Sequence, residues 1–234
     1  MTRQLYLEDA YRRVFDAKVV NICEEGIILD QTLFYPAGGG QPSDKGAIRK
    51  GASSYPVSEV SKKGKDILHR IEGNGLAAGD SVTGQIDWDR RYRLMRIHTA
   101  AHIISGIASK EFHAKITGNQ LEIERGRIDF DLERFSPDVV SMLFEKSNEI
   151  VRGDLALKTY DMAREEIEKD PEMVKLAMGL PPHLKVLRIV DIIGFDRQPD
   201  GGTHVKSTKE VGDIGFLRSE NKGKNNRRVY FTIP

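Results

Sequence analysis

Hydrophobic and polar residues alternate along the first third of the chain in short runs that are typical of β-strands. The segment FDAKVVNICEEGIILDQTLFYP, residues 15–36, holds two such runs around Glu24-Glu25-Gly26, which predicts a hairpin. The segment SYPVSEVSKKGKDILHRIEG, residues 54–73, repeats the scheme with a turn near Lys63-Gly64, and GDSVTGQIDW adds another strand. Short strands joined by glycine-rich turns, with almost no helical period, predict a small β-barrel over residues 1–87.

A helical spacing of hydrophobic positions begins near residue 88. Asp87 or Asp89 is suited to cap this helix, which is expected to run to about residue 110. Its residues on one face are Leu94, Ile97, His98, Ala101, Ile104 and Ser105. His102 follows one turn after His98, towards the edge of the same face.

Further helices and strands are expected in the second part of the chain. Ser136-Pro137, a capping residue followed by proline, predicts a helix that ends near Gly153. A third helix is expected to begin around Asp161 and to end or restart at Asp170-Pro171. The strand-like segments are QLEIERGRIDFDL, KVLRIVDIIGF, IGFLRSE and RRVYFTI. Helices packed on one face of an antiparallel sheet would make residues 88–234 an α+β domain.

Composition describes an ordinary soluble globular protein of 234 residues, with 39% hydrophobic and 30% charged residues. It has no apolar run of about 18 residues to span a membrane, and its first residues lack an apolar signal core. Cys23 is the only cysteine, so no internal disulfide can form and a cytoplasmic location is expected. Because Cys23 lies in a strand-like run, we interpret it as a buried hydrophobic residue and not as a nucleophile.

The net charge of +1 gives no general attraction to nucleic acid, so only a local basic surface could supply it. Three basic clusters are candidates: Arg90, Arg91, Arg93 and Arg96; Lys206 and Lys209; and Lys222, Lys224, Arg227 and Arg228. For each single cluster, a solvated surface or a charged turn is the simpler interpretation.

Two histidines in RIHTAAHIISG, residues 96–106, have the spacing that lets a helix grip one metal ion. Residues four apart on a helix project from the same side, with Cβ atoms about 5–6 Å apart. The HExxH helix of zinc proteases uses this geometry, but Thr99 stands here where the protease has its glutamate, which disfavours a peptidase. A histidine pair alone is weak support, since ordinary structural hydrogen bonds explain most such pairs.

A third histidine stands in QPDGGTHV, residues 198–205. His204 follows a small-residue loop that allows close backbone approach, and Asp200 lies four positions before it. One interpretation is a metal site with three histidines and Asp200, or with three histidines and an open position as in catalytic zinc. The other is a glycine turn closed by Asp200, with His204 bonded to a backbone carbonyl. Spacing alone leaves both open.

The segment DQTLFYPAGGGQPSDKG, residues 30–46, holds the three consecutive glycines Gly38, Gly39 and Gly40 before Gln41. Such a loop can expose backbone N–H groups with no side chains in the way. Gln41 offers a donor and an acceptor, and Thr32 could sense a small hydroxyl group. The alternative is a flexible turn with Phe34 and Tyr35 in the barrel core. The loop is not a P-loop, because no GK[ST] follows it.

Five stretches in this order, FYPAGGGQPSDKG, RIHTAAHIISG, GRIDF, LPPHLKVLRIVDI and QPDGGTHV, resemble the editing half of alanyl-tRNA synthetase and the freestanding alanyl-tRNA editing proteins of intermediate length. The resemblance covers nearly the whole chain. It implies a β-barrel domain over 1–87 and, over 88–234, the α+β editing domain shared with threonyl-tRNA synthetase. It also implies one Zn²⁺ held at His98, His102, Asp200 and His204. The family's usual cysteine is Asp200 here, so the three histidines are the firmer candidates and Asp200 the lesser one.

The implied reaction is hydrolysis of tRNA(Ala) wrongly esterified with serine, and sometimes with glycine. Thr32, Gln41, His98 and His102 are the catalytic candidates, and Thr32, Gly38, Gly39, Gly40 and Gln41 the substrate-binding ones. Zinc would either activate water or hold the amino group of the substrate, and the sequence does not separate these roles. Two other functions stay open: a zinc hydrolase of a small ester or amide, and a non-catalytic tRNA-binding module with a structural zinc.

Overall fold

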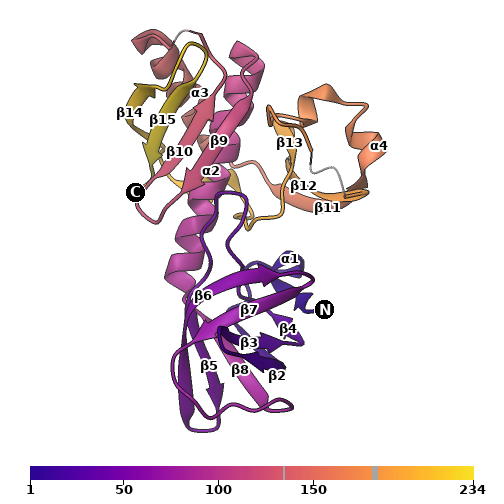
Figure 1. Cartoon of the computed structure of the whole chain (residues 1–234). Helices are drawn as coiled ribbons and strands as arrows, with labels where there is room; N and C mark the ends of the chain where they lie inside the picture. The colour runs from indigo at the N-terminus through magenta and orange to yellow at the C-terminus, as the bar shows by residue number, and fades with distance from the viewer. Residues whose placement is uncertain (134, 181–183) are drawn as a thin grey trace. The chain divides into compact units, whose positions relative to one another are not determined.

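The computed structural model of the chain describes residues 1–133, 135–180 and 184–234. It divides into two compact units, Met1–Arg93 and Leu94–Pro234 (Figure 1). The division falls inside the long helix α2 (Trp88–Phe112), six residues after the boundary expected at residues 87 and 88. Pro181, Pro182 and His183 of the LPPHLKVLRIVDI stretch lie outside the described residues.

The first unit is built on a closed β-barrel of six strands, in the spatial order β2-β3-β7-β6-β5-β8. The barrel expected from the sequence is thus confirmed, and its hairpins turn between Cys23 and Gly26 and between Lys63 and Asp66. Its strands are β2 (Val14–Cys23), β3 (Gly26–Leu29), β5 (Gly46–Lys50), β6 (Ser53–Lys63), β7 (Asp66–Ile71) and β8 (Ser81–Ile86).

The barrel interior follows from the period of two along its strands. In β2, Phe15, Ala17 and Val19 are buried while the residues between them are exposed, because successive side chains point to opposite faces. Other strands add Ile27, Leu29, Ile48, Val57, Val60, Ile67, Val82 and Ile86 to the same core. The chain begins with two short elements that the sequence pattern does not indicate, β1 (Arg3–Gln4) and helix α1 (Leu5–Glu8). Strand β1 pairs in parallel with a third short element farther along the chain, β4 (Gln31–Thr32).

Arg91 fixes both ends of the glycine-rich loop. Its guanidinium is fully buried and donates to the carboxylate of Asp44 and, at 2.6 Å, to the backbone oxygen of Leu33. It also donates to the backbone oxygen of Ala10 at 3.0 Å. Asp44 in turn accepts a 2.7 Å hydrogen bond from the backbone N–H of Tyr35. Arg91 is therefore a buried structural residue, and neither a nucleic-acid contact nor part of a solvated surface.

The second unit contains two antiparallel sheets, and its α+β class agrees with the sequence expectation. Within the described residues, the strands expected in one sheet divide between two. The four-stranded sheet has the order β14 (Gly215–Asn221), β15 (Arg227–Thr232), β10 (Gly126–Phe130) and β9 (Ile116–Leu121). The three-stranded sheet has the order β11 (Leu157–Ala163), β12 (Val186–Ile192) and β13 (Asp196–Pro199).

The capping residues define the helix ends as the sequence indicates. The carboxylate of Asp87, and not that of Asp89, accepts the backbone N–H of Arg90 at the start of α2. Helix α3 (Pro137–Arg152) begins after Ser136, whose hydroxyl accepts the N–H of Val139, and is closed by Gly153. Both helices, α2 and α3, thus begin at a residue whose side chain accepts an otherwise unpaired N–H group of the first turn.

The third helix expected from Asp161 begins only at Arg164 and is much shorter than predicted. Residues Leu157–Ala163 form strand β11, which pairs with β12 along its whole length. The buried strand β12 needs a partner on each side, and the β-forming residues Thr159 and Tyr160 suit the edge position. The helical part of the expected segment is α4 (Arg164–Ile167), and the expected restart at Asp170-Pro171 is a 3₁₀ turn at Pro171–Met173, which Asp170 caps.

Helix α2 is enclosed on all sides in the second unit, since every residue from Ile97 to Ala108 is buried. The two sheets lie on different sides of it (Figure 1). The expected single apolar face is buried as predicted, but Ile103 and Ile107 outside that face are buried as well. His98 and His102 consequently project into the protein interior. Among the described residues, no helix has both the length and the apolarity that crossing a membrane requires.

Candidate metal centre

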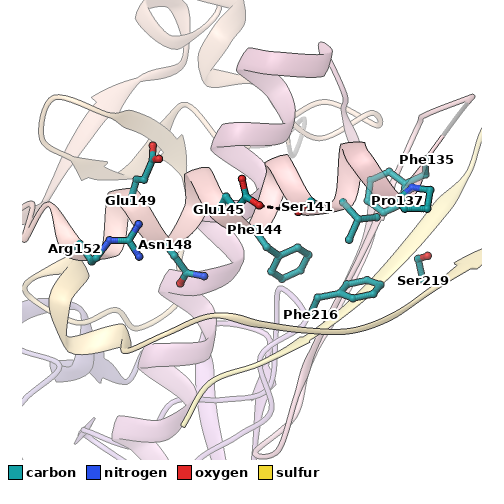
Figure 2. Close-up of a pocket in the computed structure, with 11 residues that line it drawn as sticks. Phe135, Pro137, Ser141, Phe144, Glu145, Asn148, Glu149, Arg152, Phe216 and Ser219 are labelled. Atoms are coloured by element: carbon teal, nitrogen blue, oxygen red, sulfur yellow. Dashed lines mark hydrogen bonds between the residues drawn. The ribbon is translucent and has the colours of Figure 1, made fainter.

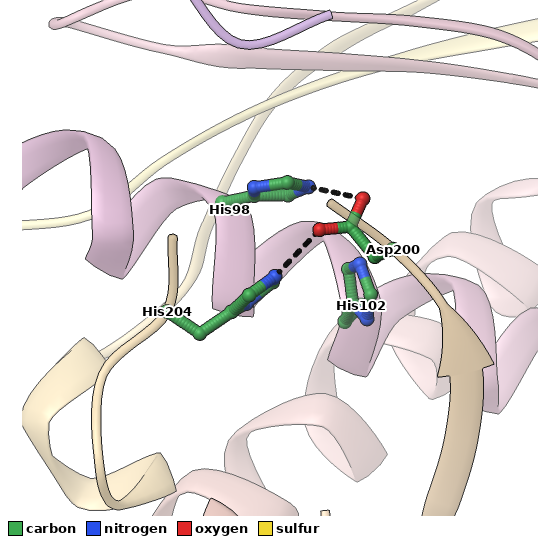
Figure 3. A group of neighbouring side chains, drawn as sticks. All are labelled: His98, His102, Asp200 and His204. Atoms are coloured by element: carbon green, nitrogen blue, oxygen red, sulfur yellow. Dashed lines mark hydrogen bonds and ion pairs between the residues drawn. The ribbon is translucent and has the colours of Figure 1, made fainter. Parts of the chain in front are cut away.

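Four side chains that are far apart in the sequence meet in the second unit. His98 and His102 come from α2, Asp200 directly follows β13, and His204 lies in the loop before the 3₁₀ turn Thr208–Val211 (Figure 3). One ligand atom from each residue lies within 4.8 Å of all the others. The structure thus brings together the three histidines and the aspartate that the sequence pattern singles out.

Asp200 lies between two of the imidazoles. Its Oδ2 is 3.1 Å from Nε2 of His204, and its Oδ1 is 3.5 Å from Nε2 of His98. The ring centre of His102 is 4.5 Å from that of His204 and 5.1 Å from that of His98. The side chain of Asp200 is 16% exposed, against 3% for His98 and 2% for His204, so the cluster reaches solvent on the Asp200 side.

Burial controls the protonation of the cluster. It lowers the pKa of His98 to about 3 and also lowers the pKa values of His102 and His204. Burial acts to raise the pKa of Asp200, but its interactions with His98 and His204 outweigh this effect and hold that pKa well below its usual range. At neutral pH the cluster therefore offers neutral imidazoles and one carboxylate, the protonation states that bind metal ions.

The loop after β13 is shaped to hold Asp200 against His98. The backbone N–H of Gly202 donates to Oδ2 of Asp200 at 2.5 Å. The guanidinium of Arg188, on β12, donates to the backbone oxygens of Asp200 and Gly202. A Cβ atom at position 202 would lie only 2.3 Å from Cε1 of His98, so only glycine fits there, whereas a Cβ at Gly201 would meet no atom within 4 Å.

Two residues outside the ligand set support the histidines. The hydroxyl oxygen of Thr99 is 3.1 Å from Nδ1 of His204, and the amide of Gln198 donates to the backbone oxygen of His102 at 3.3 Å. In the sequence, Thr99 stands out only because it replaces the protease glutamate. Its contact with His204 joins residues 105 positions apart, so no local sequence pattern could predict this contact.

The four groups fit a zinc ion by their chemistry. Imidazole nitrogens and a carboxylate oxygen are ordinary zinc ligands, with metal–ligand distances of about 2.1 Å. Two donors on one ion are then at most about 4.2 Å apart, so small side-chain rotations would bring a set spread over 4.8 Å onto a single ion. The cluster can therefore hold a metal ion.

The barrel residues singled out from the sequence belong to the first unit and not to the unit that holds the four ligands. Thr32 is fully buried, and its hydroxyl accepts the N–H of Phe34 and lies 2.8 Å from Nε2 of His69. Gly38 and Gln41 exchange both backbone hydrogen bonds, at 3.0 and 2.9 Å, which closes the loop into a tight turn. Gly39 and Gly40 have φ values of +59° and +85°, which favour glycine.

Most arginines of the basic clusters have structural contacts. Arg96 donates to the backbone oxygens of Glu210 and Val211, and Arg228 forms a two-pronged ion pair with Asp129. Arg227 donates to backbone oxygens around the β14–β15 turn. The exposed cations of the second unit's clusters are Lys206, Lys209, Lys222 and Lys224.

A groove of about 730 Å³ lies between α3 and β14 (Figure 2). Phe144 and Phe216 meet edge to face along it, with ring centres 5.4 Å apart, and its lining includes the charged residues Glu145, Glu149 and Arg152. Its lining, which lies in the described part of the chain, includes none of the four ligands. The groove is therefore separate from the metal-binding cluster.

Comparison with known proteins gives matches over both units. Residues 7–90 match the model of the class II (A) tRNA synthetases, and residues 187–230 match that of the threonyl and alanyl tRNA synthetase second additional domain. The alanyl-tRNA editing protein AlaX-M of Saccharolobus solfataricus is 46% identical over 100% of this chain and 99% of its own length. AlaX-M of Methanosarcina barkeri is 42% identical with the same coverage. The alanine–tRNA ligase of Pyrococcus abyssi is 37% identical over 98% of this chain and 26% of its own length.

Proposed function

The chain belongs to the family of alanyl-tRNA editing proteins, and from this premise we propose that it is a trans-editing hydrolase that deacylates Ser-tRNA(Ala), with Gly-tRNA(Ala) as a second candidate substrate. The observation that carries the proposal is the cluster of His98, His102, Asp200 and His204 in a chain that matches editing proteins from end to end. Because aminoacyl-tRNAs are used in translation, we assign this activity to the cytoplasm.

The cofactor proposed for this cluster is one Zn²⁺. Zinc, when bound, would supply positive charge that polarises the ester carbonyl, activates water, or orients the amino group of the substrate. The three histidines present nitrogen lone pairs to it because burial keeps their imidazoles neutral. Asp200 lies on the solvent side of the cluster and is the group that a substrate would meet first.

Selection for serine is assigned to Thr32. His69 is neutral, since burial lowers its pKa to about 4, and its Nδ1 faces the carbonyl oxygen of Ile27 at 3.3 Å and so carries the proton. Nε2 of His69 is then an acceptor, and the hydroxyl of Thr32 donates to it. Because Phe34 N–H occupies one lone pair of the Thr32 oxygen, one lone pair is left. That lone pair can accept a hydrogen bond from a serine hydroxyl.

This arrangement distinguishes serine from alanine by a single hydrogen bond. Alanine has no hydroxyl, so its acyl group would leave the remaining lone pair of Thr32 unpaired, and a buried unpaired acceptor disfavours binding. Thr32 is fully buried in this structure, so its contact with an acyl group requires the residues that cover it to move. Thr32→Val should remove the preference for serine, and an unchanged preference in that variant would exclude Thr32 from this role.

The glycine turn is assigned to positioning the end of the tRNA. A Cβ at Gly39 would meet no atom within 4 Å, so the backbone there is open to close approach by a ligand. Gln41, at the end of the turn, is almost fully buried and can offer a donor and an acceptor. Together they would hold the terminal adenosine and the ester for hydrolysis.

The test is a deacylation assay with Ser-, Gly- and Ala-tRNA(Ala), with and without a chelator. We expect chelator-sensitive release of serine with alanine spared, and loss of both zinc and activity in His98→Ala and in His204→Ala. His113→Asn is the matched control, because this histidine is exposed and outside the cluster. Full metal content in either ligand variant would contradict the shared site.

Two other outcomes would replace the proposal. Turnover of a small seryl ester that is indifferent to tRNA would identify a zinc hydrolase of small esters. Binding of tRNA without deacylation, with zinc held by four ligands, would identify a non-catalytic module.

A further inference from the structure

Thr99 lies behind the metal-binding cluster and contacts one of its histidines. It is fully buried on α2, directly after His98. Its hydroxyl oxygen is 3.1 Å from Nδ1 of His204 and also accepts the backbone N–H of Val205 at 3.3 Å. Thr99 thus holds both the side chain of His204 and the backbone of the next residue.

The orientation of His204 decides which of its nitrogens can bind a metal. Nε2 faces Asp200 and the other imidazoles, at 3.1 Å from Oδ2 of Asp200, while Nδ1 faces Thr99. A metal ligand must present a lone pair, so the proton of a neutral His204 has to reside on Nδ1. A hydrogen-bond acceptor opposite Nδ1 favours this tautomer.

We propose that Thr99 is the positioning residue that fixes His204 as an Nε2 ligand. Its hydroxyl oxygen accepts the Nδ1–H of His204 and the N–H of Val205, which fills both of its lone pairs. This is the role that carboxylates and backbone carbonyls have behind many metal-binding histidines. It rests on the metal site of the proposed function but not on the identity of the substrate.

The same position has a different chemical role in zinc proteases of the HExxH type, where a glutamate acts as the general base. Thr99 has no group that ionises near neutral pH, and its hydroxyl points to the outer nitrogen of a ligand instead of the open side of the cluster. Its contribution is therefore to metal affinity, and the removal of its hydroxyl should be visible without any substrate.

The experiment measures zinc affinity of the full-length protein by competition with a chromogenic chelator. Thr99→Val should weaken zinc binding by about 10- to 100-fold, because the acceptor for Nδ1–H is lost while the side-chain shape is nearly kept. Thr99→Ser should retain wild-type affinity, since it restores the oxygen. Ser147→Ala is the matched control, because this buried hydroxyl on α3 donates to a helix carbonyl, that of Leu143, and does not belong to the metal-binding cluster.

Wild-type zinc affinity in folded Thr99→Val would overturn the proposal, and would leave the proposed editing function intact. If Thr99→Val does not fold, as judged by circular dichroism, the imidazole ¹⁵N signals of the wild-type protein decide. In the zinc-bound protein, a hydrogen-bonded proton on Nδ1 of His204 supports the proposal, and a proton on Nε2 overturns it. A wild-type protein that binds no zinc would overturn this proposal together with the metal site.

Discussion

Removing the charge of Asp44 should destabilise the barrel unit severely. Arg91 and Asp44 are both fully buried, and three further acceptor or donor groups of the loop and the N-terminal segment depend on this pair. Asp44→Asn leaves the guanidinium buried without a counter-charge. Breaking a buried ion pair from one side typically costs about 3–5 kcal/mol, a large part of the about 5–15 kcal/mol that stabilises a whole domain.

The double variant separates the charge effect from a packing effect. Arg91→Met with Asp44→Leu removes both charges, so we expect it to lose less free energy of unfolding than the sum of the two single changes. Lys50→Met is the matched control: its 2.6 Å ion pair with Asp80 is half-exposed in the same barrel, and its loss should cost about 1 kcal/mol or less.

Urea unfolding followed by tryptophan fluorescence is suited to this measurement. Trp88 is the only tryptophan of the chain, lies in the barrel unit and stacks on Tyr92. Its emission therefore reports the unfolding of the unit that contains the ion pair. A loss below about 1 kcal/mol in Asp44→Asn, or a double variant as unstable as the summed single variants, would refute the reasoning.

Three further changes follow from single contacts. Because burial lowers the pKa of His69 from 6.5 to about 4, the unfolded chain binds the extra proton, and stability should fall by about 3 kcal/mol as pH drops through this window. His69→Gln should remove this part of the pH dependence in urea unfolding, while the part due to the buried histidines of the second unit stays; a pH dependence identical to that of the wild type would contradict it. Gly202→Ala should weaken zinc binding about tenfold or more, because its Cβ would clash with His98, while Gly201→Ala should bind normally; equal affinities would be inconsistent with that contact. Ser136→Ala should lower the free energy of unfolding by about 1 kcal/mol through loss of the helix cap, measured by thermal unfolding with exposed Ser141→Ala as control; equal losses would exclude the cap.

The sequence is most informative where structure depends on neighbouring residues. The hairpins at Glu24-Glu25-Gly26 and Lys63-Gly64, and the cap at Ser136, follow from turn and capping chemistry within a few positions. The segment from Asp161 to Ala163 is misjudged because its strand conformation depends on pairing with β12, whose partner residues are 23 or more positions away in the chain. The conformational preferences of single residues cannot indicate a strand partner so far away in the chain.

The candidate site shows the same limit. The i, i+4 spacing of His98 and His102 is visible on a helix, and the small-residue loop marks His204, so the ligand set can be proposed from pattern and resemblance. The residues that hold the ligands and loops in place cannot be proposed in this way. Thr99 and Arg188 contact the ligands or their loop through the folded chain, and the burial of Arg91 becomes visible only with Asp44 opposite it.

The donor set of the cluster has a consequence for its behaviour towards oxidants. Peroxides attack thiolates and convert them stepwise to sulfenic and sulfinic acids, which release a bound metal. Imidazole and carboxylate groups do not enter that series, and the chain's single sulfhydryl, Cys23, belongs to a β2 strand in the other unit. A centre made of His98, His102, Asp200 and His204 therefore has no thiolate ligand that peroxide could oxidise with loss of the metal.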